Sequence, residues 1–388
     1  MRVPLIAALA LTACSSAPPP PGVVCKGTVR RVANDAELSA ALAAAAPGDC
    51  VLLATGTYTG PITLATRAIT VAADEGAIAT VRSAQDGLRI DAEGVIVHGL
   101  EVNQVLRHGV VIRGPAVVLD GVQVAAAGEA GVMIKCEDSG CMMLTARTVL
   151  RDVQISGAAY GLYVDASRAS MTGGRITASA TDRVGGGAGV YAVRGADLEI
   201  DLTQIDHNIY GIIADGAATK VRATDAIVDT NADLGVWGQG LRGTIAAPAM
   251  QIQSSRISEN GITGLGAFDS AGITVEGGEI SRTIEKDVLI DLMNLVRIGD
   301  GVGALHQSTE IQISDARLVD NGRAQAVVDD PTGIIRFTAT NTISGGLHQV
   351  VVQDAGGAMV EVPPGDRSVP PMALPVRAVA FPVPAVVP

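Results

Sequence analysis

Four charged residues follow short Val- and Ile-rich segments at recurring positions along the chain: Lys135, Asp165, Arg194 and Asp215. Carboxyl groups held close to amino or guanidinium groups can act as general acid, general base and charge stabiliser. Charged residues at exposed turns are, however, usually only solvated. These four residues are therefore weak candidates for a catalytic site, and the pattern leans towards a protein without enzymatic activity.

The histidines give weaker evidence of a functional site than these charged residues. All five are scattered singly, with no pair spaced i, i+2 or i, i+4, so no metal site is predicted and no cofactor is expected. His108, which directly precedes a Gly-Val-Val-Ile segment, is the one histidine that we single out for mutation.

The N-terminus has the layout of a secretion signal. A positive start at Arg2 is followed by an apolar stretch, Val3 to Leu11, that is too short to span a membrane. Leu-Thr-Ala-Cys, ending at Cys14, resembles the bacterial lipobox, in which the cysteine is acylated and becomes the first residue of the mature protein. The resemblance implies lipid attachment at Cys14. An ordinary signal peptide with a chance cysteine is the alternative.

The remaining cysteines are even in number once Cys14 is set aside: Cys25, Cys50, Cys136 and Cys141. A secreted protein lies in a compartment that permits disulfides. The short loop between Cys136 and Cys141 favours one bridge there, which leaves Cys25 to pair with Cys50. Four free thiols or a metal site are the alternatives, but no Cys-x-x-Cys spacing or neighbouring histidine supports zinc.

Composition narrows the class of partner. The net charge is -12, and only 2% of residues are aromatic, while 46 are glycine. A surface with this much negative charge repels the phosphate backbone, so binding to nucleic acid is not expected. The small apolar side chains suit a stacked core of aliphatic residues better than a mixed globular core.

A repeat explains this composition. Tetrads of Gly followed by aliphatic residues recur about every 22 residues, with longer insertions in places. A second series of strand-like pairs keeps the same period, from Glu101-Val102 to Arg317-Leu318. Two strands per period leave no room for a crossover helix, so each turn of the chain must stack on the turn before it.

The sequence here resembles the pectin-lyase-like superfamily of right-handed parallel β-helices over residues 34–361. The capped amphipathic segment Asn34 to Leu42, Pro47-Gly48-Asp49 and Gly56-Thr57-Tyr58 carry the resemblance at its start. It implies an all-β, single-stranded solenoid with about 22–24 residues per coil and a helix that caps the N-terminal end. Four asparagines then resemble the stacked ladder of this superfamily, a structural role: Asn208, Asn231, Asn260 and Asn321.

The tetrads also predict an outward column. Alternation along a strand places the third tetrad position outside, which collects Met133, Tyr163, Tyr191 and Trp237 one turn apart. An exposed column of this kind would suit the stacking of sugar rings or contact with a protein. The alternative is that the insertions Lys135 to Thr148 and Thr177 to Ala188 fold over the column and bury it.

The family's better-known catalytic motifs are missing. Asp329-Asp330 is followed by Pro331, with no Gly-His-Gly after it, and the Arg-rich and Trp-x-Asp-His segments of the lyases are absent. We therefore expect an envelope protein that binds a polysaccharide or another envelope protein. A divergent polysaccharide lyase or glycoside hydrolase that acts on an acidic polysaccharide is the alternative, and only its lyase form would require calcium.

The expected organisation has four parts. Residues 1–13 form the lipoprotein signal, 14–33 a lipidated proline-rich tether, 34–361 the β-helix and 362–388 a proline-rich extension. The extension is either a disordered tail or a strap over the apolar end of the last coil. The protein is expected to be lipid-anchored in the bacterial envelope, at its periplasmic face or surface, with the outer membrane as the expected location.

Overall fold

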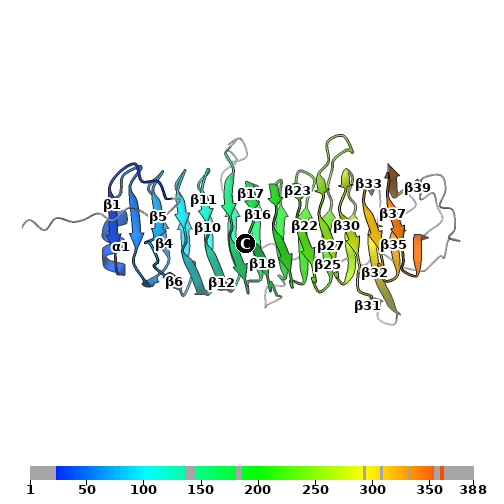
Figure 1. Cartoon of the computed structure of the whole chain (residues 1–388), viewed down its shortest axis with the longest axis horizontal. Coiled ribbons are helices and arrows are strands. Elements are labelled where there is room, and N and C mark those ends of the chain that lie inside the picture. Colours follow the sequence, from blue (N-terminus) through cyan, green and yellow to red (C-terminus); the bar gives the residue numbers. More distant parts are fainter. Residues whose placement is uncertain are drawn as a thin grey trace, which may run out of the picture.

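The computed structural model describes residues 23–135, 146–180, 186–291, 294–305, 309–329, 332–338, 340–353 and 359–361. In these residues the chain winds as a right-handed parallel β-helix, and three long sheets run side by side along its axis (Figure 1). The predicted fold class is confirmed. Lys286–Asp291 (β31), which pairs antiparallel with the longest strand, is an exception to the parallel pairing.

Each sheet collects one strand from successive turns. Sheet A contains β1 (Val29–Val32), β2 (Cys50–Leu53), β5 (Thr70–Ala73), β8 (Ile96–His98), β11 (Val118–Asp120), β14 (Thr148–Arg151), β17 (Arg168–Thr172), β20 (Asp197–Asp201), β23 (Lys220–Thr224), β26 (Met250–Gln253), β29 (Ile273–Glu276), β33 (Glu310–Ser314), β36 (Ile334–Thr338) and β39 (Met359–Glu361). Sheet B contains β3 (Gly56–Thr59), β6 (Ala79–Ser83), β9 (Glu101–Val105), β12 (Gln123–Ala127), β15 (Gln154–Ser156), β18 (Arg175–Thr177), β21 (Gln204–Asp206), β24 (Ile227–Asp229), β27 (Arg256–Ser258), β30 (Glu279–Ser281), β34 (Arg317–Val319) and β37 (Thr342–Ser344). Sheet C contains β4 (Ile62–Leu64), β7 (Leu88–Ile90), β10 (Val110–Ile112), β13 (Ala130–Lys135), β16 (Tyr160–Asp165), β19 (Ala188–Val193), β22 (Tyr210–Asp215), β25 (Leu234–Gln239), β28 (Ile262–Phe268), β32 (Asn294–Leu305), β35 (Ala324–Asp329) and β38 (His348–Gln353).

The prediction of two strands per turn is wrong, because sheet A adds a third. The predicted tetrads form sheet C and the predicted pairs form sheet B. Sheet A strands such as β20 (Asp-Leu-Glu-Ile-Asp) and β23 (Lys-Val-Arg-Ala-Thr) alternate correctly but share no common residue. They therefore do not align with one another, and no repeat in the sequence marks them.

The core is a stack of aliphatic side chains between the three sheets. Leu88, Val110 and Val132 lie opposite one another in register, and each is fully buried. Burying one such side chain contributes roughly 1.5–3 kcal/mol. The tetrad glycines allow the turns to pack closely, since a Cβ on Gly109 would lie 2.3 Å from Val124 Cγ1 and 2.5 Å from the carbonyl oxygen of Gly131.

A helix covers the N-terminal end, as predicted. It spans Asp35–Ala43 (α1), and Asn34 caps it by accepting a hydrogen bond from the backbone N–H of Glu37 at 3.0 Å. Leu38 and Ala41 are buried against the first coil. The tyrosine of the Gly-Thr-Tyr motif, Tyr58, is fully buried, and its hydroxyl lies 3.0 Å from the carbonyl oxygen of Val32. The helix thus protects the open end of an apolar stack.

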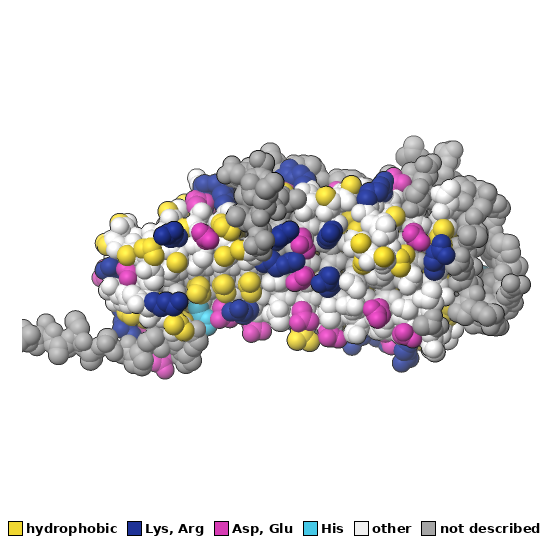
Figure 2. Space-filling view, turned by 90° about the horizontal axis from the view of Figure 1, so that it is seen from above, with side chains coloured by type: hydrophobic (Ala, Val, Ile, Leu, Met, Phe, Trp, Pro, Cys, Tyr) yellow, Lys and Arg dark blue, Asp and Glu magenta, His cyan; other side chains and the backbone are white. Residues whose placement is uncertain are grey.

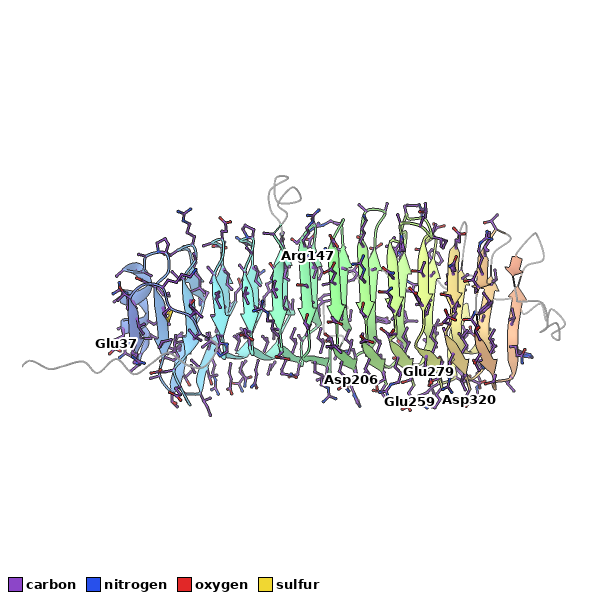
Figure 3. The ribbon with its side chains drawn as sticks, turned by 45° about the horizontal axis from the view of Figure 1, so that its top comes forward. Glu37, Arg147, Asp206, Glu259, Glu279 and Asp320 are labelled. Carbon is purple, nitrogen blue, oxygen red and sulfur yellow. A yellow bond between two sulfur atoms is a disulfide. The ribbon has the colours of Figure 1, made fainter. Side chains whose placement is uncertain are left out.

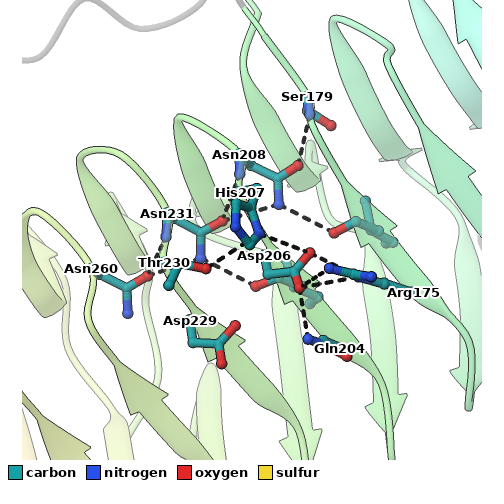
Figure 4. Close-up of polar contacts among 12 residues, drawn as sticks. Arg175, Ser179, Gln204, Asp206, His207, Asn208, Asp229, Thr230, Asn231 and Asn260 are labelled. Atoms are coloured by element: carbon teal, nitrogen blue, oxygen red, sulfur yellow. Dashed lines mark hydrogen bonds and ion pairs between the residues drawn. The ribbon is translucent and has the colours of Figure 1, made fainter.

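The predicted asparagine ladder is present in the turn between sheets B and C (Figure 4). Asn208 Nδ2 donates to Asn231 Oδ1 at 3.0 Å, and Asn231 Nδ2 donates to Asn260 Oδ1 at 2.9 Å. The acceptor oxygens also receive backbone N–H groups, as at Asn208, whose N–H lies 3.1 Å from Asn231 Oδ1. Asn321 joins the same row through Thr283. All four side chains are buried, so the ladder satisfies polar groups that water cannot reach.

Several predicted features lie outside the described residues. They are the signal segment with Cys14, the Cys136–Cys141 bridge and the extension 362–388. Within the described residues, the one α-helix is too short to cross a membrane.

Replacing Asn231 with Ala should lower the free energy of unfolding by roughly 2–4 kcal/mol, because the buried backbone N–H of Asn208 and the carbonyl oxygen of Ile205 lose their hydrogen bonds to the Asn231 side chain. Urea denaturation followed by circular dichroism would measure this. The matched control is Asn103→Ala, at a half-buried position in β9. Equal midpoints for the two variants would contradict a stabilising ladder.

Candidate functional site

The predicted outward column exists as a register feature of sheet C. Met133 lies opposite Tyr163, Tyr163 opposite Tyr191, and Ile213 opposite both Tyr191 and Trp237. Turn-to-turn stacking therefore aligns these side chains as the tetrads indicate.

The expectation that this column is exposed is wrong. Met133 is 8% exposed, Tyr191 5% and Trp237 3%, and together with Tyr160 and Ile213 they form a second apolar cluster outside the main core. The Tyr163 and Tyr191 rings meet edge to face at 5.5 Å. Large aromatic surfaces gain most from removal from water, which explains why they pack instead of facing solvent. Residues 136–145 and 181–185, the middle parts of the two insertions expected to cover the column, lie outside the described residues.

Three of the four predicted catalytic candidates meet at one end of the sheet C strands. Lys135 lies opposite Asp165 in register, and Arg194 Nε donates to Asp165 Oδ1 at 2.6 Å, while Nη2 contacts the other carboxylate oxygen. Asp165 is almost fully buried, and its carboxylate raises the pKa of Arg194. This arrangement is an ion pair between a buried carboxylate and a half-exposed guanidinium, and it joins two turns.

The fourth candidate lies further along the sheet. Asp215 is half-buried and lies opposite Val193, so one strand separates it from Asp165. Burial raises the pKa of Asp215, although hydrogen bonds from Tyr191 and from the Gly216 N–H act in the opposite direction. Burial also raises the pKa of Tyr163 to about 12, so that phenol stays protonated at neutral pH.

His108 is also enclosed. Its Nδ1 accepts the backbone N–H of Ala130 at 3.3 Å, and its Nε2 lies 3.0 Å from a carboxylate oxygen of Glu129. Burial lowers the pKa of His108, although Glu129 opposes the shift. The residue lies just before β10, at the position that Tyr160 and Tyr210 take further along sheet C, and its contacts join neighbouring turns.

A surface that the sequence analysis did not identify lies on the outer side of sheet A. At its N-terminal end the surface is covered: Val23 packs over Leu52 and Ala72, and the Cys25–Cys50 disulfide fixes the preceding segment there. The predicted pairing of Cys25 with Cys50 is confirmed. The surface becomes accessible from β8 onward.

A histidine and a carboxylate lie side by side on this surface. His98 Nδ1 is 3.1 Å from Asp120 Oδ2, and both side chains are partly exposed. Arg151 lies opposite Asp120 in the next strand, so the three residues form one column. His98 and Asp120 are 22 residues apart, which equals the repeat period. The sequence signal for this pair is therefore a spacing of one period, not a spacing of two or four residues.

Charges gather over the middle of sheet A. Arg147 Nη2 contacts Asp197 Oδ2 at 3.0 Å and Glu199 Oε1 at 3.2 Å, and Arg222 Nη1 contacts the same Glu199 oxygen at 3.3 Å. Arg168 lies 3.7 Å from Asp197. Figure 2 shows basic and acidic side chains interleaved on this side of the molecule. Such exposed pairs contribute little to stability but present donors and acceptors to solvent.

A groove of about 580 Å³ follows this charged region. Its floor is sheet A, and residues 245–248, from the loop before β26, line one side. Lys220 is exposed, and no ion pair to it is found among the described residues. The polar floor consists of Arg222, Gln251, Thr274, Glu276, Gln312 and Ser314, and Lys220 lies beside it.

Sheet B carries charges of a different kind. Arg175 Nη2 lies 2.6 Å from Asp206 Oδ2, and hydrogen bonding from Arg175 keeps the pKa of Asp206 below its usual value even though burial opposes this. Glu259 and Glu279 likewise pair with Arg282 and Arg317. In Figure 3 the labelled carboxylates of sheet B and its adjoining turns follow one edge, away from Arg147.

No group of three or more His, Cys, Asp or Glu residues that could hold a metal ion occurs in the part of the chain that the structure describes.

No family model matches the chain, and no curated protein matches it either. Solved structures with a similar course of the chain include an alginate lyase from Paenibacillus sp. str. FPU-7, which is 13% identical, covers 83% of this chain and 99% of its own, and has a TM-score of 0.42. The periplasmic alginate epimerase AlgG is 12% identical with coverage of 85% and 82% and a TM-score of 0.47. The A-module of mannuronan C-5 epimerase AlgE4 from Azotobacter vinelandii is 11% identical with coverage of 87% and 98% and a TM-score of 0.45. These likenesses transfer no residue or activity to this chain.

Replacing Arg194 with Ala should destabilise the fold by roughly 1–3 kcal/mol, because it leaves the buried Asp165 carboxylate without its half-exposed partner. Adding Asp165→Asn should recover part of the loss. The control, Arg222→Ala, removes an exposed pair and should cost less than about 1 kcal/mol. Thermal unfolding of the three variants would test this, and equal losses for the two arginine variants would contradict it.

Proposed function

We propose that this protein binds an acidic polysaccharide along the outer face of sheet A, in the groove beside β23, β26, β29 and β33. The observation that carries the proposal is the groove itself, with exposed Lys220 beside a floor of amide, hydroxyl and charged side chains. Polar groups that converge in a concave surface are the usual mark of a ligand site.

The geometry suits an extended, repeating ligand. Adjacent strands are about 4.8 Å apart, so Arg222, Gln251 and Thr274 present hydrogen-bonding groups at regular intervals along the axis. Amide and guanidinium groups are planar and can form paired hydrogen bonds with hydroxyl or carboxylate groups. A chain of sugars would meet a similar set of donors and acceptors at each step.

The charge of the ligand follows from Lys220. The protein as a whole carries a net charge of -12, which repels an acidic chain at long range. Binding must therefore depend on local cations. The groove is lined by Lys220 and Arg222, with Glu276 as the one carboxylate of its lining, and Arg222 also pairs with Glu199 beside the groove, so Lys220 is the cation that distinguishes it. A carboxylate-bearing sugar fits this balance, and neutral glycans would gain less.

The location proposed for this activity is the bacterial envelope. The apolar start, Cys14 and the proline-rich tether support secretion and lipid attachment. An anchored, rigid solenoid would hold its lateral groove away from the membrane, where an envelope polysaccharide can reach it. Another envelope protein remains the second class of partner for the same face.

Replacing both Lys220 and Gln312 with Ala should weaken binding to alginate or polygalacturonate at least tenfold, which corresponds to about 1.4 kcal/mol or more. Isothermal titration with defined oligosaccharides would measure it. The control is Arg256→Ala, which removes a comparable exposed cation from sheet B and should leave affinity unchanged. Absence of binding by the unaltered protein, or equal affinity in all three proteins, would reject the groove.

A second candidate function, cleavage of the same kind of polysaccharide, is favoured by the His98–Asp120 pair. If Nδ1 carries the proton that Asp120 accepts, Nε2 is free to take a proton from the carbon next to a uronate carboxylate. The electron pair then forms a C4–C5 double bond as the C4–O bond breaks, and the leaving oxygen takes a proton from water. Arg151, in the same column, would pair with the uronate carboxylate. Calcium belongs only to this candidate, as an additional charge stabiliser.

If this candidate is correct, incubation with alginate or polygalacturonate produces unsaturated ends that absorb ultraviolet light, and His98→Gln lowers the rate by at least a hundredfold. His207→Gln, at an exposed turn, is the control and should keep full activity. If the unaltered protein produces no unsaturated or reducing ends, the cleavage candidate is rejected and only the binding function stands.

A further inference from the structure

Sheet C has a free edge at the N-terminal end of the solenoid (Figure 1). Its first strand is β4, which pairs with β7 on one side. Between β1 and β2, where a complete coil would supply strands to sheets B and C, the chain forms α1 instead. The other side of β4 therefore has no neighbouring strand among the described residues.

The hydrogen bonds of β4 show which of its backbone groups remain open. Ile62 donates its N–H to the carbonyl oxygen of Gly87 at 2.9 Å, and Leu64 accepts the N–H of Asp91 at 3.2 Å. Because alternate residues of a parallel strand bond to opposite sides, the N–H and the carbonyl oxygen of Thr63 point towards the free edge. Neither group has a hydrogen bond to a described residue.

The adjoining edge of sheet B is treated differently. At the end of β3 the N–H of Thr59 donates to Asp35 Oδ1, in the first turn of α1, at 2.9 Å. No such acceptor or donor meets β4. The carbonyl oxygen of Pro61 and the N–H of Ala65 flank Thr63 in the same row, and within the described residues they also lack partners. An open row of this kind is a template for another strand.

A groove of about 670 Å³ lies between α1 and this edge. One wall is a single face of the helix, with the spacing i, i+3, i+4, i+7 and i+8: Asp35, Leu38, Ser39, Leu42 and Ala43. The other wall is β4 with its flanking turns, from Thr59 to Ile69. An edge strand that faces a helix across a groove is an arrangement in which an extended peptide docks by adding a strand.

The walls select apolar side chains at alternate positions. In a strand added parallel to β4, the residues opposite Ile62 and Leu64 point to the same side as these two side chains. There they meet Leu38, which is buried against the first coil, and Leu42, which is half-buried. An apolar–x–apolar sequence fits this half of the groove.

The same two residues complete the open row of backbone groups. Their N–H groups reach the carbonyl oxygens of Pro61 and Thr63, and their carbonyl oxygens reach the N–H groups of Thr63 and Ala65. A polysaccharide has no comparable alternation of donors and acceptors at this spacing. The backbone row therefore specifies a peptide.

Charge specifies the start of the peptide. Asp35 is the one charged residue that lines the groove, and it is exposed without an ion pair in the described part of the chain. It lies beside Thr59, before β4 begins, so a parallel peptide brings the residue before its first apolar position close to this carboxylate. A basic residue fits there, and the net charge of -12 attracts a cationic peptide at longer range.

We infer that the groove between α1 and β4 binds an extended, basic segment of another protein, which adds to sheet C as a parallel strand. A basic residue followed by apolar–x–apolar is the expected pattern of that segment. The site is separate from the groove on sheet A, so either can fail without the other.

A labelled peptide tests the added strand on the full-length protein. Fluorescein-Gly-Arg-Thr-Val-Thr-Val-Thr-Gly-amide should show a saturable rise in fluorescence polarisation as protein is added. The same peptide with both valines N-methylated keeps its side chains and charge but loses the two N–H donors, and it should bind at least tenfold more weakly. Absence of saturable binding by the first peptide, or equal binding of the two, would overturn the inference.

Two substitutions at one position test the edge from the side of the protein. Thr63→Pro removes an N–H that β4 does not use in its pairing with β7, as edge strands tolerate, and it should abolish peptide binding with the far-ultraviolet circular dichroism unchanged. Thr63→Val keeps this N–H and should bind like the unaltered protein. Equal binding by the two variants would contradict the added strand, and if Thr63→Pro does not fold, the N-methylated peptide still decides.

The charge and the identity of the partner are tested separately. Asp35→Asn keeps an acceptor for Thr59 and should weaken binding of the arginine peptide severalfold, whereas Glu75→Gln, at an exposed residue outside the groove, should not. Equal affinities of these two variants would remove the basic residue from the pattern. A dimer of the unaltered protein that Thr63→Pro dissociates in sedimentation would show that a second copy occupies the edge, and would overturn the assignment to another protein.

Discussion

Hydrogen bonding between successive turns, with the strands in parallel register, is the constraint on which this structure depends. Because the strands inside each sheet pair with their counterparts one turn before and one turn after, residues about one repeat apart are brought to roughly 4.8 Å from each other. Like side chains therefore form columns. Leu88, Val110 and Val132 make an aliphatic column inside the coil, and Asn208, Asn231 and Asn260 make a polar one at a corner.

The same constraint separates the outer surface into three faces with different chemistry. Sheet C presents an apolar column that is buried again from outside, sheet B presents paired arginines and carboxylates, and sheet A presents a polar groove. Side chains of one chemical kind recur at the same position in successive turns and so form a continuous strip along a face. Each face therefore has one dominant chemistry over much of its length. The candidate binding site and the covered column can thus coexist on one narrow solenoid.

A stack of parallel strands leaves unpaired backbone groups and an open apolar interior at each end, so each end needs a cover. At the N-terminal end, α1 covers the interior and the Cys25–Cys50 disulfide holds the first segment over the outside of sheet A. This cover explains why the accessible part of sheet A begins only near β8. The placement of His98 and Asp120 at that boundary follows from where the cover stops.

The sequence by itself determined the repeat, the capping helix, the asparagine ladder and the likeness of the tetrad side chains, because each depends on local pattern and on a period that can be counted. It also indicated the Cys25–Cys50 pairing, because four cysteines remain once Cys14 is set aside and the short loop between Cys136 and Cys141 favours a bridge there. Only the tertiary structure decided that a third sheet exists, since its strands share alternation but no residue. It also decided that the Tyr191 and Trp237 column is buried, because exposure depends on how side chains from many turns pack together. The contact of Asp165 with Arg194 likewise depends on how the insertion between them shifts the register, which no local pattern in the chain records. His98 and Asp120 lie one period apart, so the period alone could have paired them.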